Sequence, residues 1–286
     1  MPHGIFWMMR GNFMMTEPEH PEPQNEPDAA SSEDDTQITH DSFLDGQVQI
    51  CQPRHGYRVG TDAVVLAATI QNRSGRLLDM GAGAGGVSLA VLNRHPGCSV
   101  TAVEKDQMSF DLLEQNIALN GHQKVMRAVR GDVLALPPML KASFDHVFSN
   151  PPFHHPGDRP ARNKRRTLAH YGDGADLSDW AASALWAARH KGRVSFIIRA
   201  DRTDELIIAL KAHGAGEVLL CPVWSHQSSP ATRMVVTARK GVKGAMAMLP
   251  GLVLHHRYGA LTKQAEQVMK GDPLILRHPA NRHLSS

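Results

Sequence analysis

A glycine-rich turn between two apolar segments constrains the fold of this 286-residue chain more than any other feature. Residues 76–80 predict a short buried strand, residues 81–86 read Gly-Ala-Gly-Ala-Gly-Gly, and residues 87–94 predict a helix that stops before Pro96. A strand, a glycine turn and a helix in this order are typical of α/β proteins, which bind nucleotides at the carboxyl edge of the sheet. We therefore expect a pocket at Gly81 and Gly83, where the backbone can approach a ligand closely.

Further strand-like segments follow, and most of them are separated by a helix-like segment. The strands are expected over residues 99–104, 125–133, 144–149, 193–200, 217–224 and 234–238, and the helices over 107–119, 178–190 and 204–213. This alternation predicts a mostly parallel sheet with helices on both faces. Because the last two strands lack a crossover helix, we expect the last strand to be antiparallel. The predicted fold is α/β and Rossmann-like, with seven strands.

The first 41 residues differ in composition from the rest of the chain. Residues 16–41 hold nine of the 28 acidic residues, four prolines and no Lys or Arg, which is typical of a disordered segment. We expect residues 1–41 to be a disordered tail and residues 42–286 to form a single domain. Within that domain, residues 42–75 are expected to lie over the pocket, and a strand–helix extension is expected at the carboxyl end.

The distribution of charge, the longest apolar run and the placement of cysteines and histidines limit which partners, metals and compartments are expected. Outside the acidic segment, 31 basic residues face 19 acidic ones, a balance that suits a polyanionic partner. The longest apolar run, residues 63–70, is too short to cross a bilayer, so we expect no membrane partner. Three distant cysteines argue against a disulfide framework or a cysteine zinc site and favour the cytoplasm. The His pairs at 154–155 and 255–256 lack metal-ligand spacing, so no metal site is predicted.

Acidic residues lie at the ends of the first three predicted strands. Glu104 is placed to accept the hydroxyls of a ribose, as in both dinucleotide and S-adenosylmethionine sites. Asp79 and Asp132 separate these two cofactor classes. A carboxylate at Asp79 would crowd a pyrophosphate but suits a ligand with sulfonium and ammonium groups, and Asp132 suits an adenine amine. The acids therefore favour S-adenosylmethionine.

The segment Asn150-Pro151-Pro152-Phe153 follows the fourth predicted strand and carries the strongest chemical signal. The two prolines fix the backbone and remove donors, which leaves a rigid loop of acceptors with an aromatic ring beside it. Such a loop suits a planar substrate with an NH₂ group. Accepting the amine hydrogens aims the nitrogen lone pair at an electrophilic methyl group, so positioning and preorganised polarity supply the catalysis.

These motifs resemble the class I S-adenosylmethionine-dependent methyltransferases with an Asn/Asp-Pro-Pro-Tyr/Phe loop, which methylate exocyclic amines of bases or glutamine amides. The resemblance covers residues 43–275. The run at residues 52–66 narrows it to the tRNA1(Val) adenine-6-amine methyltransferase family, which acts on the adenosine beside the anticodon. The resemblance implies S-adenosyl-L-methionine as cofactor, contacted by Thr61, Asp79, Gly81, Gly83, Glu104, Asp132 and Asn150, and a catalytic loop of Asn150, Pro151, Pro152 and Phe153. Phe153 stands where Tyr is commoner in the family.

Five cations follow the catalytic loop within eight residues: Arg159, Arg162, Lys164, Arg165 and Arg166. Beside an amine-methylating site, we expect them to hold phosphates of an RNA substrate, with tRNA as the first choice. Methylation of a glutamine amide on a release factor or ribosomal protein, or of a guanine amine in ribosomal RNA, stays open. Two hypotheses from other functional classes are a nicotinamide-dependent oxidoreductase and an RNA-binding module without catalytic activity. The first does not explain the Asn-Pro-Pro-Phe loop, and the second gives that loop no role. The oligomeric state has no signal in the sequence.

Overall fold

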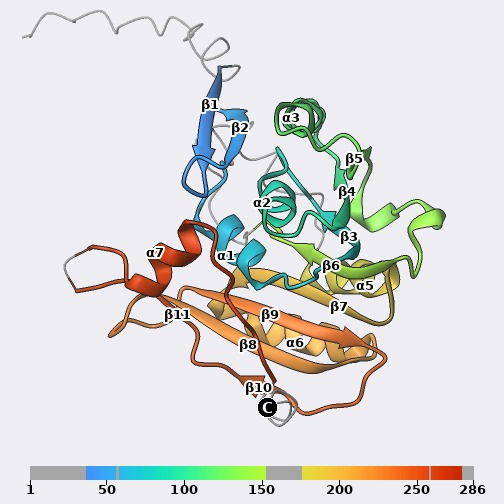
Figure 1. Ribbon diagram of the computed structural model, residues 1–286. Coiled ribbons are helices and arrows are strands. Elements are labelled where there is room, and N and C mark those ends of the chain that lie inside the picture. Colours follow the sequence, from blue (N-terminus) through green and yellow to red (C-terminus); the bar gives the residue numbers. More distant parts are fainter. Residues whose placement is uncertain (1–36, 56–57, 153–175, 258, 279–286) are drawn as a thin grey trace, which may run out of the picture.

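The computed structural model describes residues 37–55, 58–152, 176–257 and 259–278, built around one mostly parallel sheet (Figure 1). In these residues the sheet has nine strands in the spatial order β10-β8-β9-β7-β6-β3-β4-β5, with β11 also beside β8. The strands are β3 (Gly75–Met80), β4 (Cys98–Glu104), β5 (Met126–Arg130), β6 (Phe144–Ser149), β7 (Ala188–Arg199), β8 (Ala215–His226), β9 (Arg233–Lys240), β10 (Ala247–Met248) and β11 (Leu252–His255). The helices are α1 (Thr61–Thr69), α2 (Gly86–Arg94), α3 (Gln107–Leu119), α5 (Leu177–Ala187), α6 (Thr203–Ala212) and α7 (Lys263–Met269), with short 3₁₀ turns η3 (Val133–Ala135), η4 (Pro138–Leu140) and η5 (Ala200–Arg202). None of these helices is long and apolar enough to cross a membrane.

Strand directions confirm the predicted α/β class. Strand β9 is antiparallel to both of its neighbours, β7 and β8, whereas the other pairs in the sheet are parallel. The seven predicted strands correspond to β3 through β9. Strands β10 and β11 are additional, and both pair with β8 on its outer edge. With two residues, β10 is too short for hydrophobic periodicity to reveal it, whereas β11 lies in the carboxyl-terminal part of the chain where a strand–helix extension is expected.

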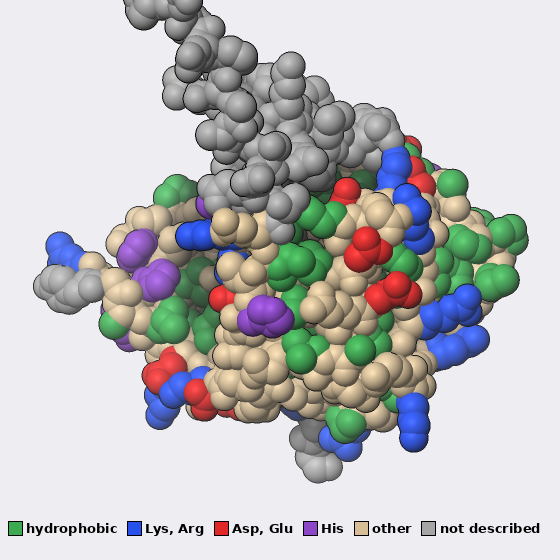
Figure 2. All heavy atoms as spheres, turned by 90° about the horizontal axis from the view of Figure 1, so that it is seen from above, with side chains coloured by type: hydrophobic (Ala, Val, Ile, Leu, Met, Phe, Trp, Pro, Cys, Tyr) green, Lys and Arg blue, Asp and Glu red, His purple; other side chains and the backbone are tan. Residues whose placement is uncertain are grey.

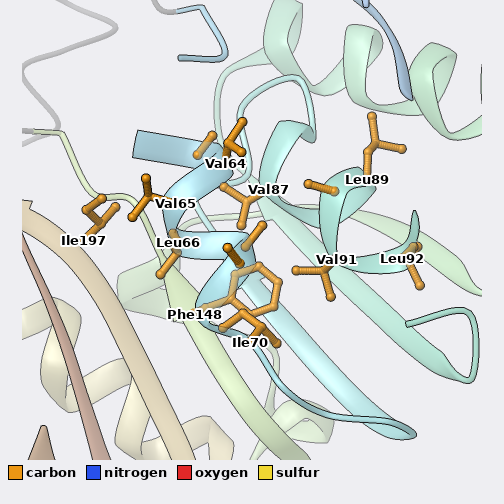
Figure 3. Packing of buried hydrophobic residues seen from close by; sticks show 14 of the residues in the cluster. Val64, Val65, Leu66, Ile70, Val87, Leu89, Val91, Leu92, Phe148 and Ile197 are labelled. Carbon is orange, nitrogen blue, oxygen red and sulfur yellow. The ribbon is translucent and has the colours of Figure 1, made fainter. Parts of the chain in front are cut away.

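Helices cover both faces of the sheet, and each face has its own hydrophobic core. Buried residues of α1, α2, α3 and α7 belong to one core, and those of α5 and α6 belong to the other. Figure 3 shows part of the first core, where Phe148 of β6 lies beside Leu66 of α1 and Ile70, the residue that follows α1. The preceding residue of β6, Val147, belongs to the second core, because successive strand residues point to opposite faces. This double coverage fixes α1 against the sheet, next to the glycine turn.

A two-stranded antiparallel hairpin, β1 (Ile38–Phe43) and β2 (Val48–Pro53), precedes the main sheet. The buried amide of Asn116 on α3 anchors it: Oδ1 accepts from the Cys51 backbone N–H at 2.7 Å, and Nδ2 donates to the Cys51 carbonyl at 2.8 Å. The expected end of the tail at residue 41 is therefore wrong by a few residues, because it falls inside β1. The acidic composition extends into this strand through Asp41, whereas its other positions are Ile38, Thr39, His40, Ser42 and Phe43.

The helix expected over residues 178–190 is shifted and shorter. It runs from Leu177 to Ala187, and its N-cap is Asp176 rather than Ser178. The Asp176 side chain accepts from the Asp179 N–H at 2.9 Å, and the Asp179 carboxylate accepts from the Asp176 N–H at 3.3 Å, which completes a capping box. Residues 188–192, expected to end the helix and turn, form the beginning of β7.

Candidate active site

One pocket joins the glycine turn to the loop after β6. Its lining comes from five places: the segment from β2 to the start of α1, α1 itself, the turn between β3 and α2, the start of α2, and the end of β6. The lining residues are Gln52, Val59, Ala63, Gly81, Ala82, Ala84, Gly86, Val87 and Asn150. The structure therefore brings together Gly81 and Asn150, which lie about seventy positions apart in the sequence.

The glycine turn approaches its neighbours too closely for side chains. Gly81 has a φ of +70°, and a Cβ there would lie 2.8 Å from the ring of Trp180 on α5. A Cβ on Gly86, the first residue of α2, would collide with the side chain of Val59. The backbone N–H groups of Gly81 and Ala82 both donate to the Val103 carbonyl, at 2.9 and 3.0 Å, which holds the turn against β4. Glycine at these two positions therefore allows the turn to pack directly against Trp180 and Val59.

Glu104, at the end of β4, is held in one orientation by backbone donors. Its Oε2 accepts from the N–H of Gly83 at 2.7 Å, and its Oε1 accepts from the N–H groups of Lys105 and Asp106, both at 2.8 Å. Burial raises the pKa of Glu104 above its usual value, while these three hydrogen bonds act to lower it. A carboxylate offers about four acceptor positions, so Glu104 keeps capacity for a ligand hydroxyl.

Asp79 lies behind the turn rather than on the pocket wall. It is buried, and its Oδ2 accepts from the Ser88 hydroxyl of α2 at 2.7 Å. Burial raises the pKa of Asp79 to about 7; the Ser88 hydrogen bond opposes this shift, and the nearby Glu104 charge adds to it. Asp79 therefore exists in both protonation states near neutral pH, and a cation bound nearby would favour the carboxylate.

Asn150 is carried into the pocket by β6, and a buried serine ties it to the glycine turn. The Ser149 hydroxyl donates to the carbonyl of Met80 at 2.7 Å. Met80 immediately precedes Gly81, and Ser149 immediately precedes Asn150. Asn150 and Pro151 are buried, whereas Pro152 is exposed. The loop that starts at Asn150 thus leaves the sheet at a point fixed directly to the turn.

The segment before α1 contributes to the pocket through residues that sequence reasoning did not single out. The buried Gln52 accepts from the Val59 N–H at 2.8 Å and donates to the Asp41 carboxylate at 3.0 Å. Arg58 bonds to that carboxylate as well, at 2.8 Å. Gln52 lies inside the run that carries the family resemblance, but a glutamine at that position does not by itself indicate a pocket residue. Trp180 could not be recognised as a neighbour of the turn either, because its position in the sequence fits an ordinary helix core.

Five expected cofactor contacts lie off the pocket wall: Thr61, Asp79, Gly83, Glu104 and Asp132. Thr61 is the exposed first residue of α1, and its neighbour Asp62 accepts from Arg233 of β9 at 2.8 Å. Asp132 caps η3 by accepting from the Leu134 N–H at 2.9 Å, and it forms an ion pair with Lys105 at 3.0 Å. That backbone hydrogen bond, with Lys105, lowers the pKa of Asp132. Asp132 therefore lies beside the residue that follows Glu104, at the same edge of the sheet.

Six predicted site residues lie outside the described residues: Phe153, Arg159, Arg162, Lys164, Arg165 and Arg166. Their roles stay predictions. Among the described residues, no group of three or more His, Cys, Asp or Glu side chains is arranged to hold a metal ion.

Solved structures resemble this fold. A crystal structure from Agrobacterium tumefaciens, described as a predicted O-methyltransferase, superimposes with a TM-score of 0.63 at 24% identity and covers 76% of this chain and 100% of that chain. The tRNA m1G37 methyltransferase of M. jannaschii gives a TM-score of 0.50 at 16% identity, over 72% of this chain and 57% of that one. At these identities the likeness concerns the fold alone.

Sequence relatives are more specific. A family model described as the methyltransferase small domain matches residues 57–170. A Vibrio vulnificus (strain YJ016) protein named tRNA1(Val) (adenine(37)-N6)-methyltransferase is 31% identical over 196 residues, 66% of this chain and 78% of the relative. A Histophilus somni (strain 2336) protein of the same name is 29% identical over 158 residues, 54% of this chain; the chain spans about two thirds of that relative's length, 66%. By its sequence, the chain belongs to the tRNA1(Val) (adenine(37)-N6)-methyltransferase family.

Proposed function

We propose that this protein transfers a methyl group from S-adenosyl-L-methionine to the exocyclic amine of an adenine in RNA, in a tRNA beside the anticodon. One observation carries this function: the glycine turn and Asn150 line the same pocket, and the Ser149–Met80 hydrogen bond joins their strands. The names of the relatives support adenine in tRNA as the target. A cofactor site and an amine-orienting site are thus adjacent.

The residues present fit the cofactor. The turn lines the pocket with backbone at Gly81 and Gly86, beside the buried amide of Asn150, and Glu104 keeps acceptor capacity at the end of the neighbouring strand. In our proposal Gly81 and Gly83 contact the cofactor through the backbone, and Glu104 accepts from its ribose. The Asp79 carboxylate stabilises the positive charges of the cofactor from behind the turn. Asp132 accepts a hydrogen bond from the adenine amine of the cofactor, and Thr61 lies at the methionine end of the cofactor. When bound, S-adenosyl-L-methionine would supply an electrophilic methyl group, whose bond to sulfur would break as its bond to the amine nitrogen forms, leaving a neutral thioether.

The chain's own part in the reaction is orientation. The Asn150 amide oxygen accepts a hydrogen bond from the target amine, which turns the nitrogen lone pair away from the ring and toward the reacting carbon. Pro151 and Pro152 fix the backbone that carries this acceptor. Because the amine is activated by geometry and fixed dipoles, no titratable base is needed before the carbon–nitrogen bond forms. The amine proton is lost afterwards to water. Phe153 is proposed to stack on the base after it leaves its helical stack.

The cations at residues 159–166 are proposed to hold phosphates near the target nucleotide. We propose the cytoplasm as the compartment, because Cys51, Cys98 and Cys221 are buried free thiols, which suits a reducing environment. The acidic segment before β1 is proposed to be a tail outside the catalytic domain, and β11 with α7 to be its carboxyl-terminal extension.

Methyl transfer from tritiated S-adenosylmethionine to total RNA and, separately, to a protein extract tests the proposal. We expect label in tRNA, recovered as N6-methyladenosine after digestion to nucleosides. Label in glutamine of a protein would show that the substrate is a protein amide and not an adenine. Label in guanosine would instead favour methylation of a guanine amine in ribosomal RNA. No transfer at all, together with tight binding of a dinucleotide, would favour the oxidoreductase.

Glu104→Ala is expected to weaken S-adenosylmethionine binding by about 1–3 kcal/mol, because it leaves ribose hydroxyls and three backbone donors unpaired. Titration calorimetry measures the effect. The control is Glu114→Ala, an exposed acid on α3, which should bind the cofactor like the parent protein. If folded Glu104→Ala bound as tightly as the control, the cofactor pocket would have to be reassigned.

A further inference from the structure

A second groove opens at the carboxyl end of β8 and β11, beside the start of α7. Its charged or titratable lining residues are His226, His255, His256, Arg257 and Lys263. Figure 2 shows several histidines close together near the left side of the molecule, the side on which α7 and β11 lie in Figure 1. The rest of the lining is apolar or polar, and it contains no Asp or Glu. The groove is therefore cationic or neutral all round.

The side chains in this groove are arranged to donate hydrogen bonds. The rings of His226 and His255 lie with their centroids 5.7 Å apart. His255 is held by the Gly259 carbonyl, which accepts from Nδ1 at 3.0 Å. His226, His256, Arg257 and Lys263 are exposed, so their donors are accessible from solvent. Arg and Lys offer donors and no acceptors, which matches an anion such as a phosphate group.

The groove lies on the same edge of the sheet as the active site. Strand β8 runs in the direction of β3 and β6, because it is antiparallel to β9, which is antiparallel to β7. Three strand spacings separate β6 from β8 and a fourth leads to β11, so the groove is about 14–19 Å from Asn150 along the edge. Arg233, at the start of β9, lies between the two places.

We propose that this groove binds the phosphate backbone of the RNA substrate at a distance from the nucleotide being methylated. The inference rests on the proposed function and adds a second contact region to it. A nucleic-acid strand carries one charge about every 3.4 Å, so an RNA whose base enters the pocket extends several phosphates along this edge. Such contacts set the orientation of the RNA without reading its bases. The groove then selects RNA of sufficient length and shape.

The double variant Arg257→Ala, Lys263→Ala tests the groove in the full chain. Its control is Lys211→Ala, Lys243→Ala, which removes two exposed lysines near the opposite edge of the sheet, where α6 leads into β8 and β9 leads into β10. Binding of an unmodified tRNA1(Val) transcript is measured between 50 and 200 mM salt, and methyl transfer is measured in parallel. For the groove variant we expect the slope of log affinity against log salt to fall by about 1.4–1.8, and KM for the transcript to rise roughly tenfold. The effect should fall on KM rather than on kcat.

The control variant should behave like the parent protein in both measurements. An unchanged salt slope in the groove variant, or an equal loss in both variants, would overturn the groove while the parent's methyl transfer to tRNA left the proposed function intact. Absence of methyl transfer by the parent would instead contradict the proposed function, and the binding slopes would still decide the groove.

Discussion

Asn150→Ala is expected to lower kcat about 10²–10³-fold, the usual cost of losing one preorganised hydrogen-bonding group in a transition state. Asn150 lies in the pocket that the glycine turn also lines, at the point where β6 ends. Its acceptor matters most when the amine nitrogen pyramidalises toward the methyl carbon, so the loss should appear in kcat. Single-turnover methylation of RNA at saturating enzyme and cofactor measures this step directly.

Two further variants separate chemistry from folding. Asn150→Asp should keep part of the activity, because a carboxylate also accepts hydrogen bonds. Asn93→Ala, which removes a half-buried amide on α2 that donates to Gln47 at 3.0 Å, should have the parent rate. Cofactor affinity of Asn150→Ala, measured by calorimetry, should change little. If Asn150→Ala methylated RNA at the parent rate, orientation of the amine by this residue would have to be abandoned.

Asp79→Asn is expected to remove a pH dependence of stability from the cofactor-free protein. Asp79 has a folded pKa of about 7 against 3.8 as its ordinary value, so between these values the folded state binds more protons than the unfolded state. The contribution of Asp79 is therefore complete below pH 4 and is lost as the pH rises through 7. The loss is on the order of 4 kcal/mol. The difference between parent and Asp79→Asn unfolding free energies, from urea titrations at pH 4 to 8, measures it.

The sign of this difference is the decisive observation. The parent protein should lose stability relative to Asp79→Asn as the pH rises. Ser88→Ala, which removes the hydroxyl that donates to Asp79, should move the midpoint of this loss to higher pH. A pH-independent difference between parent and Asp79→Asn would mean that Asp79 ionises as freely in the folded protein as in the unfolded chain.

The sequence predicts those parts of the fold that have a regular hydrophobic periodicity or that require a particular backbone conformation, such as a glycine turn. The strand before Gly81, the glycine turn and the helix after it follow from local pattern, and so does the reversed direction of β9. The hairpin β1–β2 was missed because Asn116 of α3, more than sixty residues away, anchors it. Helix α5 was misplaced because Asp176 and Ser178 are both good caps, and only the reciprocal bond with Asp179 decides between them.

For the site, too, the sequence predicts some positions and not the contacts between distant segments. Gly81 and Asn150 were expected in one pocket because both follow parallel strands, whose carboxyl ends share one edge of the sheet. The chain pattern could not reveal that Val59 packs on Gly86, that Trp180 lies against Gly81, or that Gln52 holds the segment before α1. These are contacts between distant segments, set by tertiary packing. The same applies to Asp132, whose partner Lys105 comes from the neighbouring strand's loop.

In the proposed function, the hydrogen bond from Ser149 to Met80 gives the cofactor and the RNA one connected support. A shift of the glycine turn would reach the residue before Asn150, because the Ser149 hydroxyl donates to the Met80 carbonyl at 2.7 Å inside the core. By linkage, the factor by which cofactor changes the affinity for RNA must equal the factor by which RNA changes the affinity for cofactor. In the proposed function, one buried hydroxyl thus holds the cofactor turn and the substrate acceptor at a fixed spacing.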